Sequence, residues 1–228
     1  MTPDDAFGEW LYQHIADALV VRRVEWVDGI AARLQAGEAA AGRRFVIVVA
    51  LSEMTAFTVP GRYIYVTGRL IEYCPGEAAL AFVIAHELAH HQLGHLRFFP
   101  RWLRRAANNW LVEIILLSVH GIQHALNGPE RECAADRRAL ELCLLAGYDP
   151  DDCLRIFGQM EDRLLDLGDV EGVYGPDESD DELLPDAPIR TKLRIWAWQR
   201  TRGYLPVRDR RRALEVYLND LRSRRVTA

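Results

Sequence analysis

The apolar positions of the N-terminal part of the chain follow two different periods. Over residues 4–36 they recur every three to four residues, in two runs: Phe7, Leu11 and Ile15, then Trp26, Ile30 and Leu34. This spacing puts them on one face of a helix, so we expect a single amphipathic N-terminal helix that ends at Gly37. Residues 45–51, FVIVVAL, are a β-branched run typical of a buried strand. Two short apolar runs within 56–66 flank Pro60-Gly61, a turn signal, so a small sheet of three or more strands is expected.

Helical periodicity dominates the rest of the chain. Leu80, Val83, Ile84 and Leu88 form one stripe, which predicts a helix over residues 77–93. Further helices are expected over 97–126 (a hairpin), 130–146 and 151–166, then a mobile acidic loop at 168–188 and a basic helical tail at 189–228. The pattern predicts one α+β domain over residues 1–228: an N-terminal helix (1–36), a core (45–166), the loop and the tail.

Composition and charge fit a soluble globular protein. Half of the 228 residues are hydrophobic, 27% are charged, and the net charge is −5. A mild negative charge argues against a dedicated nucleic-acid binder. The tail departs from this balance, with twelve Arg or Lys against three Asp or Glu over 189–228. Binding of DNA or RNA through the tail therefore stays open as an alternative.

The sequence favours a cytoplasmic protein. The start, MTPDDAFGEW, has no signal-peptide pattern, and the four cysteines show neither zinc-finger nor disulfide spacing. The longest apolar run, 110–119, contains Glu113 and is about half a membrane span, so we expect no transmembrane helix. Arginines and aromatic residues interleave over 97–110. They are compatible with a peripheral membrane contact through 97–119, and a cleft wall or a dimer contact would explain the same residues equally well.

The candidate chemistry lies in the stretch VIAHELAHHQLGH, on the helix predicted over 77–93. His86 and His90 are four residues apart, so both rings point to one face of that helix and suit two ligand positions of one zinc ion. Glu87 directly follows His86, within reach of a zinc-bound water as a general base. This is the His-Glu-x-x-His arrangement of metallopeptidases.

A catalytic zinc needs a third protein ligand. The candidates are Glu132, Asp136, His91, His95, His120 and His124. His91 is rotated about 100° from His90 and faces away. Glu132 and Asp136 share one helix face, so one can bind the metal while the other accepts a hydrogen bond from a ligand's second ring nitrogen.

Three stretches in order, GRYIYVTGRLIEYC, EAALAFVIAHELAHHQLGH and ECAADRRALELCLLAGYDP, make the chain resemble a known family. It is the zinc endopeptidase family of the CAAX prenyl proteases and the HtpX-type stress proteases, metallopeptidase family 48. The resemblance implies a zincin-like fold with a metal-bearing helix and one Zn²⁺ per chain. It implies His86, His90 and Glu132 as zinc ligands, Glu87 as catalytic base and Asp136 as the group that orients a ligand.

The same resemblance implies an edge strand beside the substrate, here Thr55-Ala56-Phe57. Two features depart from the family. Members often span the membrane, whereas this chain has only the 110–119 run. The family's His-Pro pair before an Arg-Ile is matched here by Ala187-Pro188 and Arg194-Ile195, without the His. Arg194 is the candidate for transition-state support, and Tyr204 is a weaker one.

These observations predict a zinc-dependent endopeptidase that hydrolyses peptide or unfolded-protein substrates through a metal-activated water. Two alternatives remain open. One is a zinc peptidase that cleaves repressors in stress responses or phage immunity and uses a similar motif. The other is a non-catalytic interaction protein stabilised by zinc. The acidic loop is either a solvated linker or a cover that keeps the cleft closed.

Overall fold

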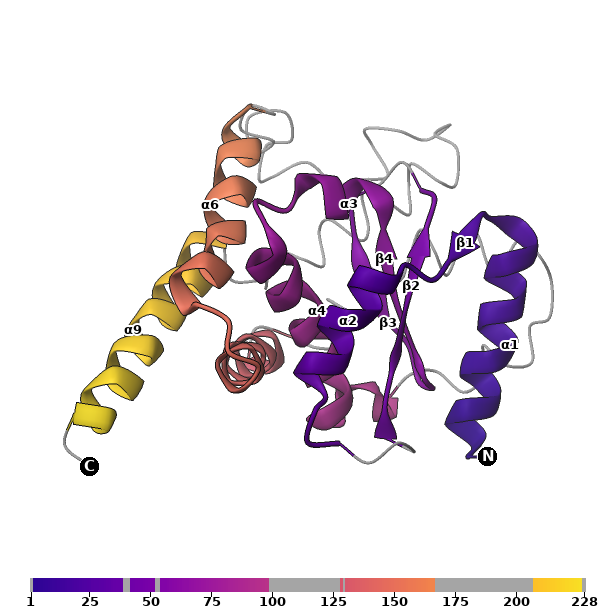
Figure 1. The fold of residues 1–228 in the computed structure, drawn as a ribbon, viewed down its shortest axis with the longest axis horizontal. Coiled ribbons are helices and arrows are strands. Elements are labelled where there is room, and N and C mark those ends of the chain that lie inside the picture. The colour runs from indigo at the N-terminus through magenta and orange to yellow at the C-terminus, as the bar shows by residue number, and fades with distance from the viewer. Residues whose placement is uncertain are drawn as a thin grey trace, which may run out of the picture.

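A small sheet between helices organises the fold. The computed structural model describes residues 2–38, 42–51, 54–98, 128, 130–166 and 207–226. In Figure 1, helix α1 lies on one side of the sheet, α2 and α4 lie on the other, and α6 and α9 lie beyond α4. This arrangement confirms the predicted α+β class.

The sheet has four strands in the order β1-β2-β4-β3. The central strands β2 (Phe45–Val49) and β4 (Tyr63–Thr67) are parallel to each other. The outer strands β1 (Val21–Arg22) and β3 (Ala56–Thr58) run antiparallel to them. The predicted strands are therefore present, and β3 lies at one edge of the sheet.

Alternation along the central strands divides the core into two layers. Tyr65 packs with α1, whereas its neighbours Ile64 and Val66 pack with α2 and α4. The α1 layer consists of Phe7, Leu11, Ile15, Ile47, Val49, Phe57, Val59 and Tyr65. Because successive strand side chains point to opposite faces, one short strand can serve both layers.

The prediction of a single helix over residues 4–36 is wrong. The structure has α1 (Pro3–Ala18), the strand β1 and then α2 (Glu25–Leu34). Leu19 is already extended, with φ −136° and ψ 156°. Val20 and Val21 favour extended backbone, and Val21 pairs with Val49 of β2. The two apolar runs thus belong to two helices on opposite faces of the sheet, a difference that periodicity alone does not reveal.

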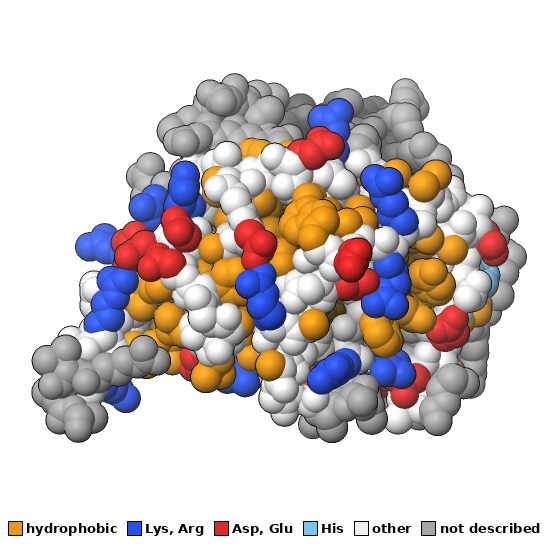
Figure 2. All heavy atoms as spheres, in the orientation of Figure 1, with side chains coloured by type: hydrophobic (Ala, Val, Ile, Leu, Met, Phe, Trp, Pro, Cys, Tyr) orange, Lys and Arg blue, Asp and Glu red, His pale blue; other side chains and the backbone are white. Residues whose placement is uncertain are grey.

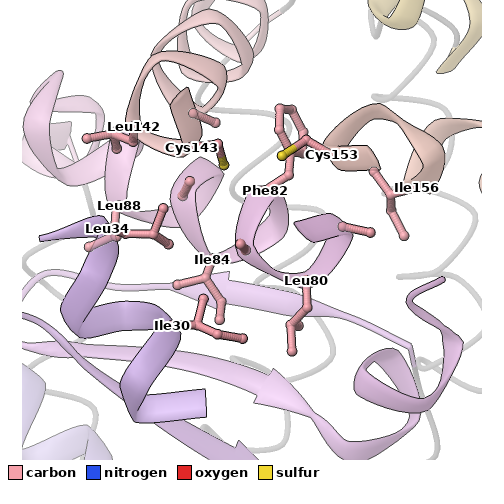
Figure 3. Packing of buried hydrophobic residues seen from close by; sticks show 14 of the residues in the cluster. Ile30, Leu34, Leu80, Phe82, Ile84, Leu88, Leu142, Cys143, Cys153 and Ile156 are labelled. Carbon is pink, nitrogen blue, oxygen red and sulfur yellow. The ribbon is translucent and has the colours of Figure 1, made fainter. Parts of the chain in front are cut away.

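Helix α4 (Glu77–Gln92) is the central helix and carries the histidine motif. Figure 3 shows Ile84 and Leu88 of α4 beside Ile30 and Leu34 of α2, and Phe82 turned towards Cys153 of α6. Ten of its sixteen residues are buried. A helix packed on most of its sides holds its side chains in fixed positions, which a metal centre requires.

The remaining helices surround α4. A helix over residues 130–145 agrees with the predicted 130–146, and α6 (Pro150–Asp166) begins at the expected proline. The tail forms α9 (Val207–Val226). Besides β1, two short helical elements were not predicted, α3 (Gly68–Tyr73) and the 3-10 turn η2 (His95–Phe98), because each is too short to show a period.

Several expectations fall outside the described residues, which leave out 99–127 and 167–206. These are the 110–119 run, most of the 97–119 membrane contact, the 168–188 loop, and Arg194, Tyr204, His120 and His124. Among the residues described, no helix is both long and apolar enough to cross a membrane.

Candidate metal centre

His86 and His90 meet on one face of α4. One helical turn separates them, and their Nε2 atoms are 3.1 Å apart. The side chain of His86 is 14% exposed and that of His90 is 3% exposed. Two imidazole nitrogens this close, on a rigid buried helix, are arranged to share one positive ion.

Glu132 brings a carboxylate to the same point from the helix over 130–145. Its Oε2 lies 3.3 Å from Nε2 of His86, and its Oε1 lies 3.4 Å from Nε2 of His90. One ligand atom from each of the three residues lies within 4.8 Å of the other two, and no other such cluster occurs among the residues described. Two imidazoles and one carboxylate are a donor set that fits a catalytic zinc, which keeps a fourth position open.

Asp136 lies one turn after Glu132 and contacts the other nitrogen of His86. Its Oδ1 is 2.9 Å from Nδ1 of His86, and its side chain is 1% exposed. A carboxylate here fixes the ring so that Nε2 faces Glu132. The geometry therefore brings together the four residues that the sequence selected as ligands and orienting group.

The sequence did not select Arg210, on α9. Its Nε donates to Oδ2 of Asp136 at 2.7 Å, a second guanidinium nitrogen contacts Oδ1, and the same nitrogen lies 3.8 Å from Oε2 of Glu132. The expected arginine was Arg194, which lies outside the described residues. The sequence could indicate only that two buried carboxylates need a nearby cation. It could not show which arginine of the arginine-rich tail supplies that cation.

These contacts determine the charges of the centre. Burial opposes the charged form of His86, but its hydrogen bonds with Asp136 and Glu132 raise its pKa to about 10. Burial and the nearby charge of His86 lower the pKa of His90 to about 2. Burial opposes ionisation of Asp136, yet Arg210 and His86 hold its pKa below the usual 3.8. Burial also opposes ionisation of Glu132, but His86 holds its pKa below the usual 4.5, so the carboxylates of Glu132 and Asp136 are both ionised at neutral pH.

Two other histidines follow His90: His91 in the last turn of α4 and His95 at the start of η2. His91 faces away from the centre, as expected, and contacts Thr58 through Nε2 and Arg44 through Nδ1. His95 was considered only as a candidate third ligand, but its Nδ1 lies 3.0 Å from Nδ1 of His90. Its contact with His90, like that of Arg210 with Asp136, is one that sequence reasoning did not foresee.

A cleft of about 250 Å³ opens onto the centre. Glu87, 6% exposed, lines it beside His86, His90, Glu132 and Arg210. Thr55 and Ala56, at the edge strand β3, form one wall. The other wall is apolar and includes Leu70, Phe82, Val83, Ile156, Phe157 and Met160.

Comparison with known proteins supplies the classification. A search of curated proteins found no match to the chain. The model of Peptidase family M48 matches residues 22–201. The matched segment contains the whole donor set and ends before Arg210. The match covers well over half of the chain and agrees with the family resemblance of its motifs, so this chain belongs to peptidase family M48, a family of metallopeptidases.

Proposed function

We propose that the protein is a zinc-dependent endopeptidase. The observation that carries the proposal is the convergence of His86, His90 and Glu132 at a cleft that Glu87 also lines, in a chain of peptidase family M48. Two nitrogens and one carboxylate oxygen match zinc better than magnesium or calcium, which prefer all-oxygen sites.

Glu87 is the general base of the proposed reaction. A zinc ion held by His86, His90 and Glu132 would supply Lewis acidity, which lowers the pKa of water to about 7 and polarises a carbonyl. The Glu87 carboxylate accepts a proton from the attacking water and then delivers it to the nitrogen of the departing amine. Its side chain lines the cleft together with His86 and His90.

The walls of the cleft support an extended peptide as substrate. In the described part of the chain β3 is an edge strand, so one side of its backbone has no partner strand there. A peptide that adds to such an edge is held through its main chain, largely irrespective of sequence. Peptides and unfolded protein segments offer this extended backbone, whereas folded proteins rarely do.

Charge on the described surface does not favour nucleic acid as a partner. On the face in Figure 2, acidic and basic side chains are interspersed rather than gathered by sign. Four arginines of α9 form ion pairs within the protein: Arg210, Arg211, Arg222 and Arg224. We propose a cytoplasmic peptidase whose basic tail helps to build the metal centre.

Metal content and proteolysis, measured together on wild type and Glu87→Gln, test the proposal. Both proteins should hold one zinc, because the substitution keeps all three ligands. Casein cleavage should fall by a factor on the order of 10² to 10⁴ in Glu87→Gln. Glu72→Gln, an exposed glutamate on α3, is the matched control and should cleave like wild type.

The outcomes separate the alternatives. Zinc in both proteins without cleavage of casein or peptides would favour a structural metal, and the non-catalytic reading would replace ours. Cleavage confined to a transcriptional repressor would favour the repressor-cleaving peptidase. Equal cleavage by wild type and Glu87→Gln would refute the role of Glu87.

A further inference from the structure

We propose that His95 positions the metal ligand His90 by accepting a hydrogen bond from its second ring nitrogen. This inference rests on the proposed metal centre and extends it. His95 is a positioning residue, since it acts through His90. The observation that carries it is the 3.0 Å distance between the Nδ1 atoms of the two rings.

The two nitrogens of His90 face different partners. Its Nε2 is directed towards His86 and Glu132, at 3.1 and 3.4 Å. When Nε2 offers its lone pair to a metal, the proton of a neutral imidazole is on Nδ1. That N–H points at Nδ1 of His95, which must then accept, so the proton of His95 is on its Nε2.

The end of α4 brings His95 back to His90. On a continuing helix, His95 would be rotated about 140° from His90 and would point away. The helix ends at Gln92 instead, and Gly94 has a φ of +70°, a conformation that glycine adopts readily. The chain reverses there, and the rings of His90 and His95 come to 5.0 Å between centroids.

The two ligand histidines would then have different supports. His86 donates from Nδ1 to Asp136, a carboxylate paired with Arg210. His90 donates from Nδ1 to a neutral ring. Both satisfy the general rule that a histidine bound to a metal gives its other N–H to a fixed acceptor, and loss of such an acceptor weakens metal binding about 10- to 100-fold.

The test compares His95→Leu with His95→Asn. Leucine removes the acceptor, whereas asparagine places a carbonyl oxygen, Oδ1, at the same branch as the lost Nδ1. His91→Asn is the matched control, because this ring ends the same helix but contacts Thr58 and Arg44. The zinc dissociation constant of each purified full-length protein is measured by competition with a chromogenic chelator. Circular dichroism verifies folding, and the visible spectrum of bound Co²⁺ reports ligand geometry.

We expect His95→Leu to bind zinc about 10- to 100-fold more weakly and to change the Co²⁺ spectrum, with His95→Asn and His91→Asn close to wild type. Wild-type affinity in His95→Leu would overturn the role of His95 alone. Equal weakening in folded His95→Leu and His95→Asn would also overturn it, because a restored acceptor would not have rescued binding. Failure of wild type to bind zinc would instead overturn the proposed metal centre, and this inference with it.

Discussion

Arg210 and Asp136 join the C-terminal helix to the metal centre across 74 residues of sequence. The guanidinium of Arg210 contacts both carboxylate oxygens of Asp136, whose side chain is 1% exposed. The same carboxylate also contacts the ring of His86 through Oδ1. A planar, permanently charged fork suits this two-oxygen contact, and an ammonium does not reproduce it. Helix α9 therefore contributes directly to the site.

Arg210→Met is expected to destabilise the protein strongly. Removal of one partner from a buried ion pair leaves an uncompensated charge on Asp136, a loss of about 3–5 kcal/mol. Urea unfolding measures it. Arg211→Met, which affects an exposed pair with Glu215 on the same helix, should change stability by less than about 0.5 kcal/mol. Similar small changes in both variants would show that the buried pair contributes little.

Zinc should stabilise wild type and not Glu132→Gln. A ligand that binds only the folded state at 100 times its dissociation constant adds about 2.7 kcal/mol. The substitution removes the anionic ligand while it preserves side-chain size. Thermal unfolding with chelator and with added zinc measures the difference, and Glu130→Gln, exposed on the same helix, should respond like wild type. A zinc response in Glu132→Gln equal to that of wild type would mean that Glu132 is not a ligand.

Ala56→Pro should impair cleavage more than folding. The amide of Thr67 donates to the carbonyl of Thr55 at 3.0 Å, so by alternation the backbone groups of Ala56 point to the open edge of β3. Proline removes that outward N–H, and edge strands tolerate it. Loss of one main-chain hydrogen bond to substrate should lower kcat/KM about tenfold. Ala56→Gly keeps the N–H and serves as control; equal rates in the two variants would contradict binding along β3.

We expect the raised pKa of Tyr63 to make the folded protein less stable at alkaline pH. Burial and a hydrogen bond to Glu9 raise the pKa of Tyr63 from 10.0 to about 12. Because the folded-state pKa is raised, this contribution is complete below pH 10 and is lost as the pH rises towards 12. Urea unfolding of wild type and Tyr63→Phe at pH 8, 10 and 11.5 measures it. Wild type should lose more stability than the variant over this range, and parallel losses would contradict the assignment.

Local patterns were sufficient to predict many elements and the paired histidines of the candidate site, and the family resemblance added Glu132. Helical spacing placed His86 and His90 on one face and Glu132 and Asp136 on another, because i and i+4 positions coincide on any α-helix. Strand alternation and the Pro60-Gly61 turn located the sheet for similar reasons. These rules depend on neighbours in the sequence, so they hold before the chain folds.

Long-range packing decided the features that local patterns could not predict. The periodicity of residues 4–36 could not show that Val21 leaves the helix to pair with Val49, because strand pairing depends on a partner far along the chain. The turn at Gly94 brings His95 back to His90, and the docking of α9 selects Arg210 among many arginines. The sequence by itself determined the candidate donors, with the family resemblance selecting Glu132 among them; only the tertiary structure decided which groups support them, since those groups meet through space rather than through spacing.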